Sequence, residues 1–412
     1  MPKHHLSQLR VARCGYCDCL LQIPPLMRNQ NAECPRCMSV TAYGRDWSLN
    51  RLAAIALAAL ILMPLAYTEP LLKINLFGVN INASLWEGLW QMAWQGFPVT
   101  ATLVLLCAVA APALFAGGIF YLWIARRFRW SLRPCLLILE KLKEWVMLDV
   151  YLLALGVTAF KIRDYALLNG GFGLIPLFLL TLLMTLLMIH FNPAQLWQRY
   201  YPLPVPSSNT PPEQILHCPH CHYSGQPNVA GRCPRCLMKM RSRYQQSLQK
   251  TWAAVLAAIV MLLPANLLPI SILYVRGVRA EDTIMSGILS LVQNNNVPIA
   301  IIVFVASILV PLVKIVVMLA LLISVQFRIG WQRRWQLNLF RFVSIIGRWS
   351  MLDLFVLALM MSLVDRDQIL SFTLGPAAFF FCAAVYLTML AAEWFDTRLI
   401  WDVHAKPTTS RT

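Results

Sequence analysis

Eight apolar segments fill most of this 412-residue chain and limit what it can fold into. Hydrophobic residues make up 58% of the chain and charged residues only 13%, which is outside the range of soluble globular proteins. A helix needs about 20 mainly apolar residues to cross a bilayer. The sequence therefore predicts an all-α polytopic membrane protein. The expected spans lie near residues 52–72, 97–125, 145–160, 172–191, 252–273, 297–325, 349–364 and 371–394.

The sequence Trp-x-Met-Leu-Asp occurs twice, at residues 145–149 and 349–353, and each copy opens an apolar segment. A carboxylate in hydrocarbon costs about 2.5–3.5 kcal/mol at the centre of a helix. Asp149 and Asp353 lie near the start of their predicted spans, where this cost is smaller. We expect both side chains to face protein or water rather than lipid.

Other residues recur at nearly the same separation, which indicates an internal repeat. Each copy holds a cysteine-rich segment followed by four apolar segments. Because four is an even number, both copies enter the membrane from the same side, and the repeat is a parallel one. The matched pairs include Cys14 with Cys218, Cys17 with Cys221, Pro98 with Pro298, Pro112 with Pro311 and Pro176 with Pro376.

Eight of the twelve cysteines form Cys-x-x-Cys pairs outside the apolar segments. Two such pairs can close on one tetrahedral ion, the arrangement of a zinc ribbon. Four thiolates leave no open coordination position, so both zinc sites are expected to be structural. The expected metal ligands are Cys14, Cys17, Cys34 and Cys37 in the first ribbon and Cys218, Cys221, Cys233 and Cys236 in the second.

Three alternatives to zinc are weighed for these thiols. Disulfides require an oxidising compartment, and the polar, basic start of the chain shows no secretory signal peptide. A redox role fits a lone Cys-x-x-Cys better than paired ones. Iron in place of zinc is compatible with the same ligands.

These patterns divide the chain into six parts. A proline-rich segment separates the two copies of the repeat. The predicted parts are a first zinc ribbon (1–46), a first transmembrane unit of four spans (47–195), a Pro-rich linker (196–213), a second zinc ribbon (214–246), a second transmembrane unit of four spans (247–397) and a tail (398–412).

The basic residues predict the orientation. If the ribbons are cytoplasmic, the inner segments hold 28 of the 35 Lys and Arg residues and the outer segments only six. Cytoplasmic loops of membrane proteins carry such an excess of positive charge. Both termini, both ribbons and the tail are therefore expected in the cytoplasm, where the thiols stay reduced. The net charge of +17 thus reflects membrane topology, and no nucleic-acid partner is expected.

One lysine, Lys314, lies inside a predicted span, and its counterpart in the first unit is Phe115. Asp353, on the next span, is its expected partner. One interpretation is a structural ion pair that pins two helices. The other is a proton-linked or substrate-contacting pair in a polar cavity. A lysine that extends to the membrane surface is a third alternative.

The expected transport cavity includes further polar residues. Ser307 lies seven residues before Lys314 and so on the same helical face. In the first unit the only cation near Asp149 is Lys143, toward the cytoplasmic surface. The two units are therefore expected to differ in function. The predicted cavity residues are Lys314, Asp353, Ser307, Ser350, Thr388, Asp149 and Lys143.

Common catalytic motifs are missing from the sequence. We find no P-loop, no Gly-x-Ser-x-Gly and no His-Glu-x-x-His. The sequence therefore predicts a protein that is not an enzyme.

Two four-cysteine ribbons, each before four apolar segments with a Trp-x-Met-Leu-Asp motif, resemble the paraquat-inducible protein A family of bacterial inner-membrane proteins. The resemblance covers about residues 10 to 402. Within the family, residues 44–49, 142–149, 263–271 and 347–353 are most similar to members that work with the LetB tunnel, which is built of stacked MCE rings.

This resemblance implies a lipid transporter component of the inner membrane. It implies a periplasmic MCE-domain tunnel protein (LetB-like) as partner, phospholipids as cargo and a role in outer membrane integrity. The polar cluster of the second unit would then belong to the transport mechanism, with protonation of Asp353 near Lys314 as a means of coupling. The rivals are a stand-alone small-molecule secondary transporter, a quinone-linked redox enzyme and an inert anchor for the tunnel.

Overall fold

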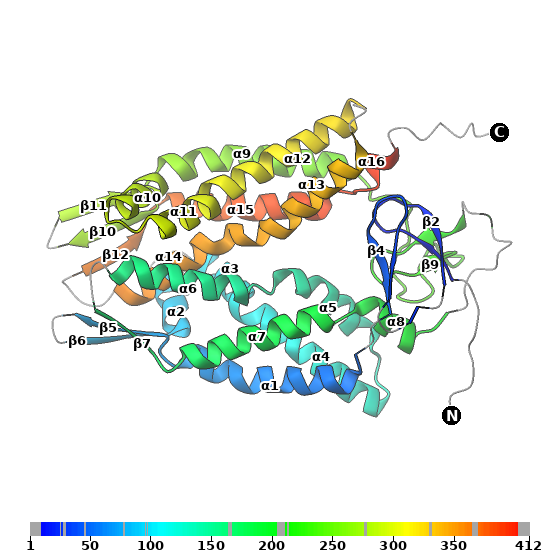
Figure 1. The fold of residues 1–412 in the computed structure, drawn as a ribbon, viewed down its shortest axis with the longest axis horizontal. Helices are drawn as coiled ribbons and strands as arrows, with labels where there is room; N and C mark the ends of the chain where they lie inside the picture. The colour runs from blue at the N-terminus through cyan, green and yellow to red at the C-terminus, as the bar shows by residue number, and fades with distance from the viewer. Residues whose placement is uncertain are drawn as a thin grey trace.

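The computed structural model describes residues 10–402 apart from short gaps (Figure 1). Residues 1–9 of the predicted first ribbon, 403–412 of the predicted tail and half of the predicted linker lie outside the described residues. The gaps are residues 25, 28–29, 45–46, 77–78, 95, 97, 164–166, 204–210, 212–213, 276–277, 329–331 and 365–369.

The same order of elements occurs twice along the chain, in what we call the first and second units. The first unit comprises α1 (Leu49–Thr68), β5 (Leu72–Leu76), β6 (Val79–Ala83), α2 (Leu85–Trp94), α3 (Pro98–Leu105), η1 (Leu106–Ala110), α4 (Ala111–Phe128), α5 (Arg133–Trp145), α6 (Leu148–Arg163), β7 (Leu167–Gly170) and α7 (Leu174–His190). The second comprises α9 (Ser247–Leu267), β10 (Ser271–Val275), β11 (Val278–Asp282), α10 (Ile284–Gln293), α11 (Val297–Phe304), η3 (Val305–Leu309), α12 (Val310–Gln326), α13 (Arg333–Ile346), η4 (Gly347–Met351), α14 (Leu352–Val364), β12 (Leu370–Leu374) and α15 (Ala377–Trp394).

Six helical segments of the described chain are long and apolar enough to cross a membrane, so the protein is a multi-pass membrane protein. The sequence predicted eight spans. The other two candidates, α6 and α7, have 16 and 17 residues, fewer than the about 20 that an upright span needs. After a bend of 57°, α7 continues into α8 (Pro193–Tyr200). By length and composition the described chain therefore supports six spans, or seven with this bent pair.

Strands are the main departure from the predicted all-α fold. Each unit carries a three-stranded antiparallel sheet, β6-β5-β7 in the first and β11-β10-β12 in the second. In the first unit β5 and β6 form a local hairpin, with Lys73 opposite Asn82. The strands β7 and β12 join from much later in the chain, which no local sequence pattern indicates. The described chain is mostly helical, with these two three-stranded sheets and three two-stranded ones in the cysteine-rich segments.

Both sheets lie at one end of the helix bundle, and the two cysteine-rich segments lie at the other (Figure 1). Both units therefore run in the same direction through the bundle. The first cysteine-rich segment holds β1 (Arg10–Arg13), β2 (Leu20–Ile23), β3 (Asn31–Glu33) and β4 (Val40–Tyr43), and the second holds β8 (Leu216–His217) and β9 (Ser224–Gly225).

The repeated motif marks the junction between an amphipathic helix and an apolar one. In the first unit α5 ends at Trp145, and α6 begins at Leu148. In the second unit the 3-10 turn η4 connects α13 directly to α14.

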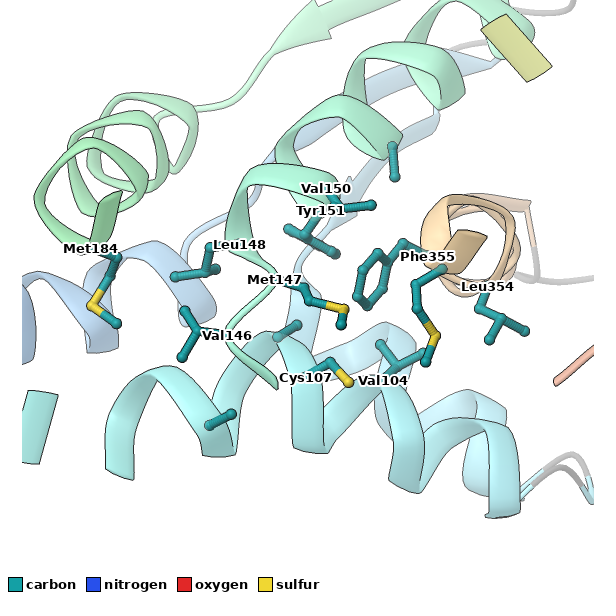
Figure 2. Packing of buried hydrophobic residues seen from close by; sticks show 14 of the residues in the cluster. Val104, Cys107, Val146, Met147, Leu148, Val150, Tyr151, Met184, Leu354 and Phe355 are labelled. Atoms are coloured by element: carbon teal, nitrogen blue, oxygen red, sulfur yellow. The ribbon is translucent and has the colours of Figure 1, made fainter. Parts of the chain in front are cut away.

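The helices α6 and α14 pack against each other between the two units. Tyr151 and Phe355 hold matching positions in them, and their rings meet edge to face with centroids 5.6 Å apart (Figure 2). Both rings are buried, as are Met147 and Leu354 beside them. Equivalent helices thus form the seam between the units.

Each unit has a π-helical turn immediately before a helix that starts with proline in its first turn. Pro112 has no N–H group to donate to the carbonyl of Ala108, four residues earlier. The hydroxyl of Tyr67 donates to that carbonyl instead, at 3.0 Å. In the second unit Pro311 stands in the same relation to Ser307. Such turns are frequent at functional sites.

Two predicted boundaries need correction. The predicted linker at 196–213 begins inside α8, which ends at Tyr200. The predicted tail at 398–412 begins with the short helix α16 (Leu399–Asp402), whose Ile400 and Trp401 are buried. Gln195 of α8 donates to Tyr43 O of the first cysteine-rich segment, and Ile400 of α16 shares a hydrophobic cluster with the cysteines of that segment. Proline content and charge do not indicate these contacts.

Gly171 and Gly375 occupy matching turns after the third strand of each sheet. A Cβ atom on Gly375 would lie 2.0 Å from the carbonyl oxygen of Pro269, and one on Gly171 would lie 1.9 Å from that of Pro70. The amide of Gly375 also donates to Ile270 at 2.9 Å. The backbone therefore approaches the glycine too closely for any side chain.

We expect Gly375→Ala to lower the free energy of unfolding by about 2–4 kcal/mol, since backbone atoms would have to move. The control is Gly287→Ala in α10, where an added Cβ meets nothing within 4 Å and alanine favours the helix by up to about 1 kcal/mol. Thermal unfolding of the purified proteins in detergent measures both. Equal melting temperatures for the two variants would contradict the proposed steric contact.

Candidate metal centres and polar site

Each Cys-x-x-Cys pair forms the same tight turn. The residue after the second cysteine donates its N–H to the carbonyl of the first, as from Asp18 to Cys14 at 3.0 Å. In all four turns this residue has a left-handed backbone, with φ of 59° at Asp18, 56° at Met38, 53° at His222 and 64° at Leu237. Two such residues cost each ribbon about 2–4 kcal/mol.

The four cysteine sulfurs of each ribbon lie within 4.8 Å of one another, and all eight side chains are buried. The Sγ atoms of Cys17 and Cys34 are 3.5 Å apart, and those of Cys218 and Cys236 are 3.6 Å apart. Four sulfurs at 2.3 Å from a tetrahedral zinc ion are separated by about 3.8 Å. Each set can therefore hold a metal ion. Structural zinc contributes about 10–16 kcal/mol, which exceeds the strain of the turns.

Neighbouring polar groups surround these sulfurs. Ser39 Oγ lies 2.9 Å from Cys37 Sγ and 3.2 Å from Cys14 Sγ, so its hydroxyl can donate to a thiolate. Burial, followed by the nearby His222, lowers the pKa of His217 to about 3, which keeps this imidazole neutral. Cys19 is not in either group of four.

A second group of polar side chains lies within the apolar helices of the second unit. Ser307, Lys314 and Ser350 expose 1%, 2% and 1% of their surface. Among the described residues, no hydrogen-bond partner is found for Ser307 Oγ, Lys314 Nζ or Ser350 Oγ. They come from η3, α12 and η4, which contact one another. A buried polar group without a partner costs about 1–3 kcal/mol, and more when charged, so these atoms indicate a binding site.

Gly347 makes room for Lys314. A Cβ atom at Gly347 would lie 3.1 Å from Lys314 Nζ and 3.3 Å from its Cε. In the first unit the matching positions hold Phe115 in place of Lys314 and Lys143 in place of Gly347. The lysine and the glycine that admits it therefore occur together only in the second unit.

Asp353 lies in the first turn of α14 and is buried. Thr388 on α15 is also buried, and its hydroxyl donates to Val385 O at 2.8 Å. The elements that carry Lys314, Asp353 and Thr388 all contact η4. Lys314 Nζ makes no hydrogen bond within the described chain. A direct Lys314–Asp353 pair therefore stays a prediction.

The first unit has a different arrangement. Asp149 begins α6 with its side chain exposed. Lys143 is partly buried and donates to Phe191 O at 3.5 Å. Burial, together with Arg348, lowers the pKa of Lys143. Asp149 and Lys143 thus do not form a buried polar cluster like that of the second unit.

The profile of the family described as "Paraquat-inducible protein A" matches residues 49–201 and 248–405. The chain belongs to this family. The relatives include "Lipophilic envelope-spanning tunnel protein A" of Escherichia coli (strain K12), which is 52% identical over 392 residues, 95% of this chain and 91% of the relative. The resemblance predicted from the motifs is confirmed.

Two other relatives of this paraquat-inducible protein A family member carry transport names. "Probable intermembrane transport protein" of Haemophilus influenzae (strain ATCC 51907 / DSM 11121 / KW20 / Rd) is 46% identical over 418 residues, 98% of this chain and 99% of the relative. "Intermembrane transport protein PqiA" of Escherichia coli (strain K12) is 30% identical over 409 residues, 98% of each chain. No solved structure matches the chain significantly.

Sequence reasoning missed two features of this family member's polar site. Gly347 stands within the 347–353 motif but gave no sign of facing a lysine on another helix. The π-helical turn at Ser307 was also missed, although the proline four residues later is its cause. The signal that could have found them is the difference between the two units. The second unit has Lys314 and Gly347 where the first has Phe115 and Lys143.

We expect purified full-length protein to contain two equivalents of zinc by elemental analysis, one for each buried four-sulfur cluster. Because the left-handed turns need the metal's binding energy, removing the metal with a chelator should lower the melting temperature. Well-folded protein with one equivalent or none would contradict the assignment, and two equivalents of iron would change the metal. Cys19→Ser is the control, because Cys19 lies outside both clusters. It should leave the zinc content at two equivalents.

We expect Gly347→Ala to reduce function while leaving stability unchanged or slightly raised. The added Cβ displaces the flexible end of Lys314, and alanine favours a helix by up to about 1 kcal/mol over glycine. Melting temperature and complementation of an envelope defect measure the two effects. Gly117→Ala in α4, where nothing lies within 4 Å, is the matched control. Full complementation by Gly347→Ala would show that the lysine position does not matter.

Proposed function

We propose that this protein is the inner-membrane lipid transporter component of an envelope-spanning system that moves lipids between the inner and outer membranes. The names of its relatives support this proposal, since they describe intermembrane transport and an envelope-spanning tunnel protein. Their matches extend over nearly the whole chain. No catalytic motif suggests an enzyme.

The observation that carries the proposal is the set of buried polar atoms without partners on Ser307, Lys314 and Ser350. An ammonium and two hydroxyls can donate hydrogen bonds to a phosphate or an ester carbonyl. The apolar helices around them suit acyl chains. A phospholipid headgroup in this site would satisfy all three donors at once.

We propose eight spans, four in each unit, with both termini and both ribbons in the cytoplasm. The helices α6 and α7 are short, but each is flanked by a strand or bend that can lie at the membrane surface, and 16 or 17 apolar residues suffice where the bilayer thins locally. The exposed tryptophans Trp86, Trp90 and Trp94 on α2 lie beside the sheets, as expected at a membrane–water interface. The basic loops at the ribbon end support this orientation.

The proposed partner is a periplasmic MCE-domain tunnel protein that docks at the sheet end. Both three-stranded sheets lie together at that end (Figure 1), opposite the proposed cytoplasmic ribbons. Lipid released from the second unit toward the sheets would enter the tunnel there. A stand-alone small-molecule transporter is the alternative, and it would need no such partner.

We further propose that Asp353 and Lys314 couple lipid movement to proton movement. Both side chains are buried on helices that contact the same turn, η4. A buried carboxylate near a lysine changes its protonation when a charged headgroup enters or leaves. The first unit, which lacks the lysine, would act as scaffold.

The test of this function is photo-crosslinking of lipid in the membrane. A photoreactive residue at Ser350 should label radioactive phospholipid in living cells, because it lies in the proposed headgroup site. The same residue at Val146, the matching position in the first unit, is the control. Equal labelling at both positions, or none at Ser350 in folded protein, would refute a lipid site in the second unit.

We expect Lys314→Met and Asp353→Leu each to destabilise the protein, and the double variant to recover stability without activity. Removing one partner of a buried pair strands a charge and costs about 3–5 kcal/mol, whereas removing both strands none. Thermal stability and envelope complementation measure the cycle. Asp149→Leu, at the exposed matching position, is the control and should have a milder effect.

Each other outcome of the cycle has a definite meaning. Recovery of both stability and activity in the double variant would show a structural pair. Losses that simply add would show that the two side chains do not meet. Full complementation by either single variant at wild-type abundance would remove the pair from the mechanism.

A further inference from the structure

The two ribbons are arranged crosswise, which means that each one packs against the unit that does not follow it directly in the sequence. The first ribbon precedes the first unit in sequence, yet its buried cysteines share a hydrophobic cluster with Leu337, Ala391 and Ile400 of the second unit and α16. The second ribbon lies toward the first unit, where His222 Nε2 is 2.6 Å from Glu140 on α5. The first ribbon thus contacts the second unit, and the second ribbon contacts the first unit.

The first ribbon offers the carbonyl oxygens of its two metal-binding turns to side chains near the second unit. On the first turn, Arg398 donates to Gly15 O and Thr397 to Tyr16 O, both at 3.3 Å. On the second turn, α13 supplies the donors. Arg334 donates to Pro35 O at 3.2 Å and to Arg36 O at 3.1 Å, and Arg341 to Cys37 O at 3.5 Å.

Cation–π contacts strengthen the same interface. The guanidinium of Arg341 lies over the ring of Tyr16, 5.2 Å from its centroid. In the opposite direction, Arg36 of the ribbon lies over Trp401 of α16 at 4.6 Å. Each such contact contributes about 0.5–2 kcal/mol. These contacts hold the first ribbon against both α13 and α16.

The helix that carries two of these arginines leads directly into the polar site. α13 continues through η4, which places Gly347 against Lys314 and holds Ser350. A buried hydrogen bond of 2.6 Å from Gln336 to Ser324 also ties α13 to α12, the helix of Lys314. The helix α13 therefore reaches the polar site by two routes, through Gly347 in η4 and through its hydrogen bond to α12.

We propose that the first ribbon positions the polar site of the second unit, with Arg334 and Arg341 as positioning residues. The arginines bind three successive carbonyls, of Pro35, Arg36 and Cys37, in the turn that carries Cys34 and Cys37, and a metal ion bound to these two cysteines would hold the three carbonyls in place. Metal in the first ribbon thus fixes α13, and α13 fixes Gly347 and Ser350. This inference rests on the proposed function only for the identity of the ligand that the polar site binds.

Hydrogen–deuterium exchange of the full-length protein in lipid nanodiscs tests the proposal. We expect the double variant Arg334→Gln, Arg341→Gln to exchange at least about threefold faster in the peptide 347–353, while α10 is unchanged. Arg328→Gln, an exposed arginine at the end of α12, is the matched control. The Cys34→Ser, Cys37→Ser variant should give the same local increase, and Cys233→Ser, Cys236→Ser should give none in that peptide.

Unchanged exchange in 347–353 for the arginine variant would overturn the proposal, whatever the lipid labelling shows. A uniform increase across the second unit would also overturn it, since that is general destabilisation. Equal increases from the two ribbon variants would show no preference for the first ribbon. Because exchange does not depend on lipid transport, the proposed function can fail while this result stands. Arg341→Lys keeps the charge and one donor at this position. A smaller increase of exchange in 347–353 for this variant than for the Gln variant would support positioning by hydrogen bonds.

Discussion

Burial of the Lys314 ammonium within apolar helices is the constraint on which the second unit depends. An ammonium without a partner in such a place is costly, so its surroundings must supply space and polar groups. Gly347 supplies the space, since no Cβ fits comfortably beside Nζ. Ser307 and Ser350 supply hydroxyls. Within the described chain the fold thus gathers three buried polar atoms that have no hydrogen-bond partner.

The irregular backbone around this site follows from proline. Pro311 cannot donate to Ser307 O, and the helix widens into a π-helical turn there, as it does before Pro112. In the first unit Tyr67 closes the equivalent gap with a hydrogen bond to Ala108 O. The two units therefore share a backbone device but differ in the side chains that fill it. The equivalent turn is closed by the hydroxyl of Tyr67 in the first unit and contains the buried Ser307 in the second.

Much of this organisation could be predicted from sequence because it is local or periodic. Apolar length predicted the helices, and Cys-x-x-Cys spacing predicted the four-sulfur groups. Other features could not be predicted because they depend on long-range contacts. The strand β7 joins β5 from the far side of α6, and Gly347 faces a lysine on a different helix. Helix bounds are a further case, since α7 has 17 residues where the predicted span 172–191 is longer, and α6 begins at Leu148 and not at Trp145.

The crosswise ribbons make the two units depend on each other. The first ribbon is covalently attached to α1 but is bound by Arg334 and Arg341 on α13, and the second is attached to α9 but contacts Glu140 on α5. Neither unit can complete its ribbon contacts without the other. The Tyr151–Phe355 contact between α6 and α14 also joins the units, through equivalent positions. Along the chain, η4 lies between α13, which binds the first ribbon, and α14, which packs against α6. The turn that carries Gly347 and Ser350 is therefore held from both of its ends by contacts outside the second unit.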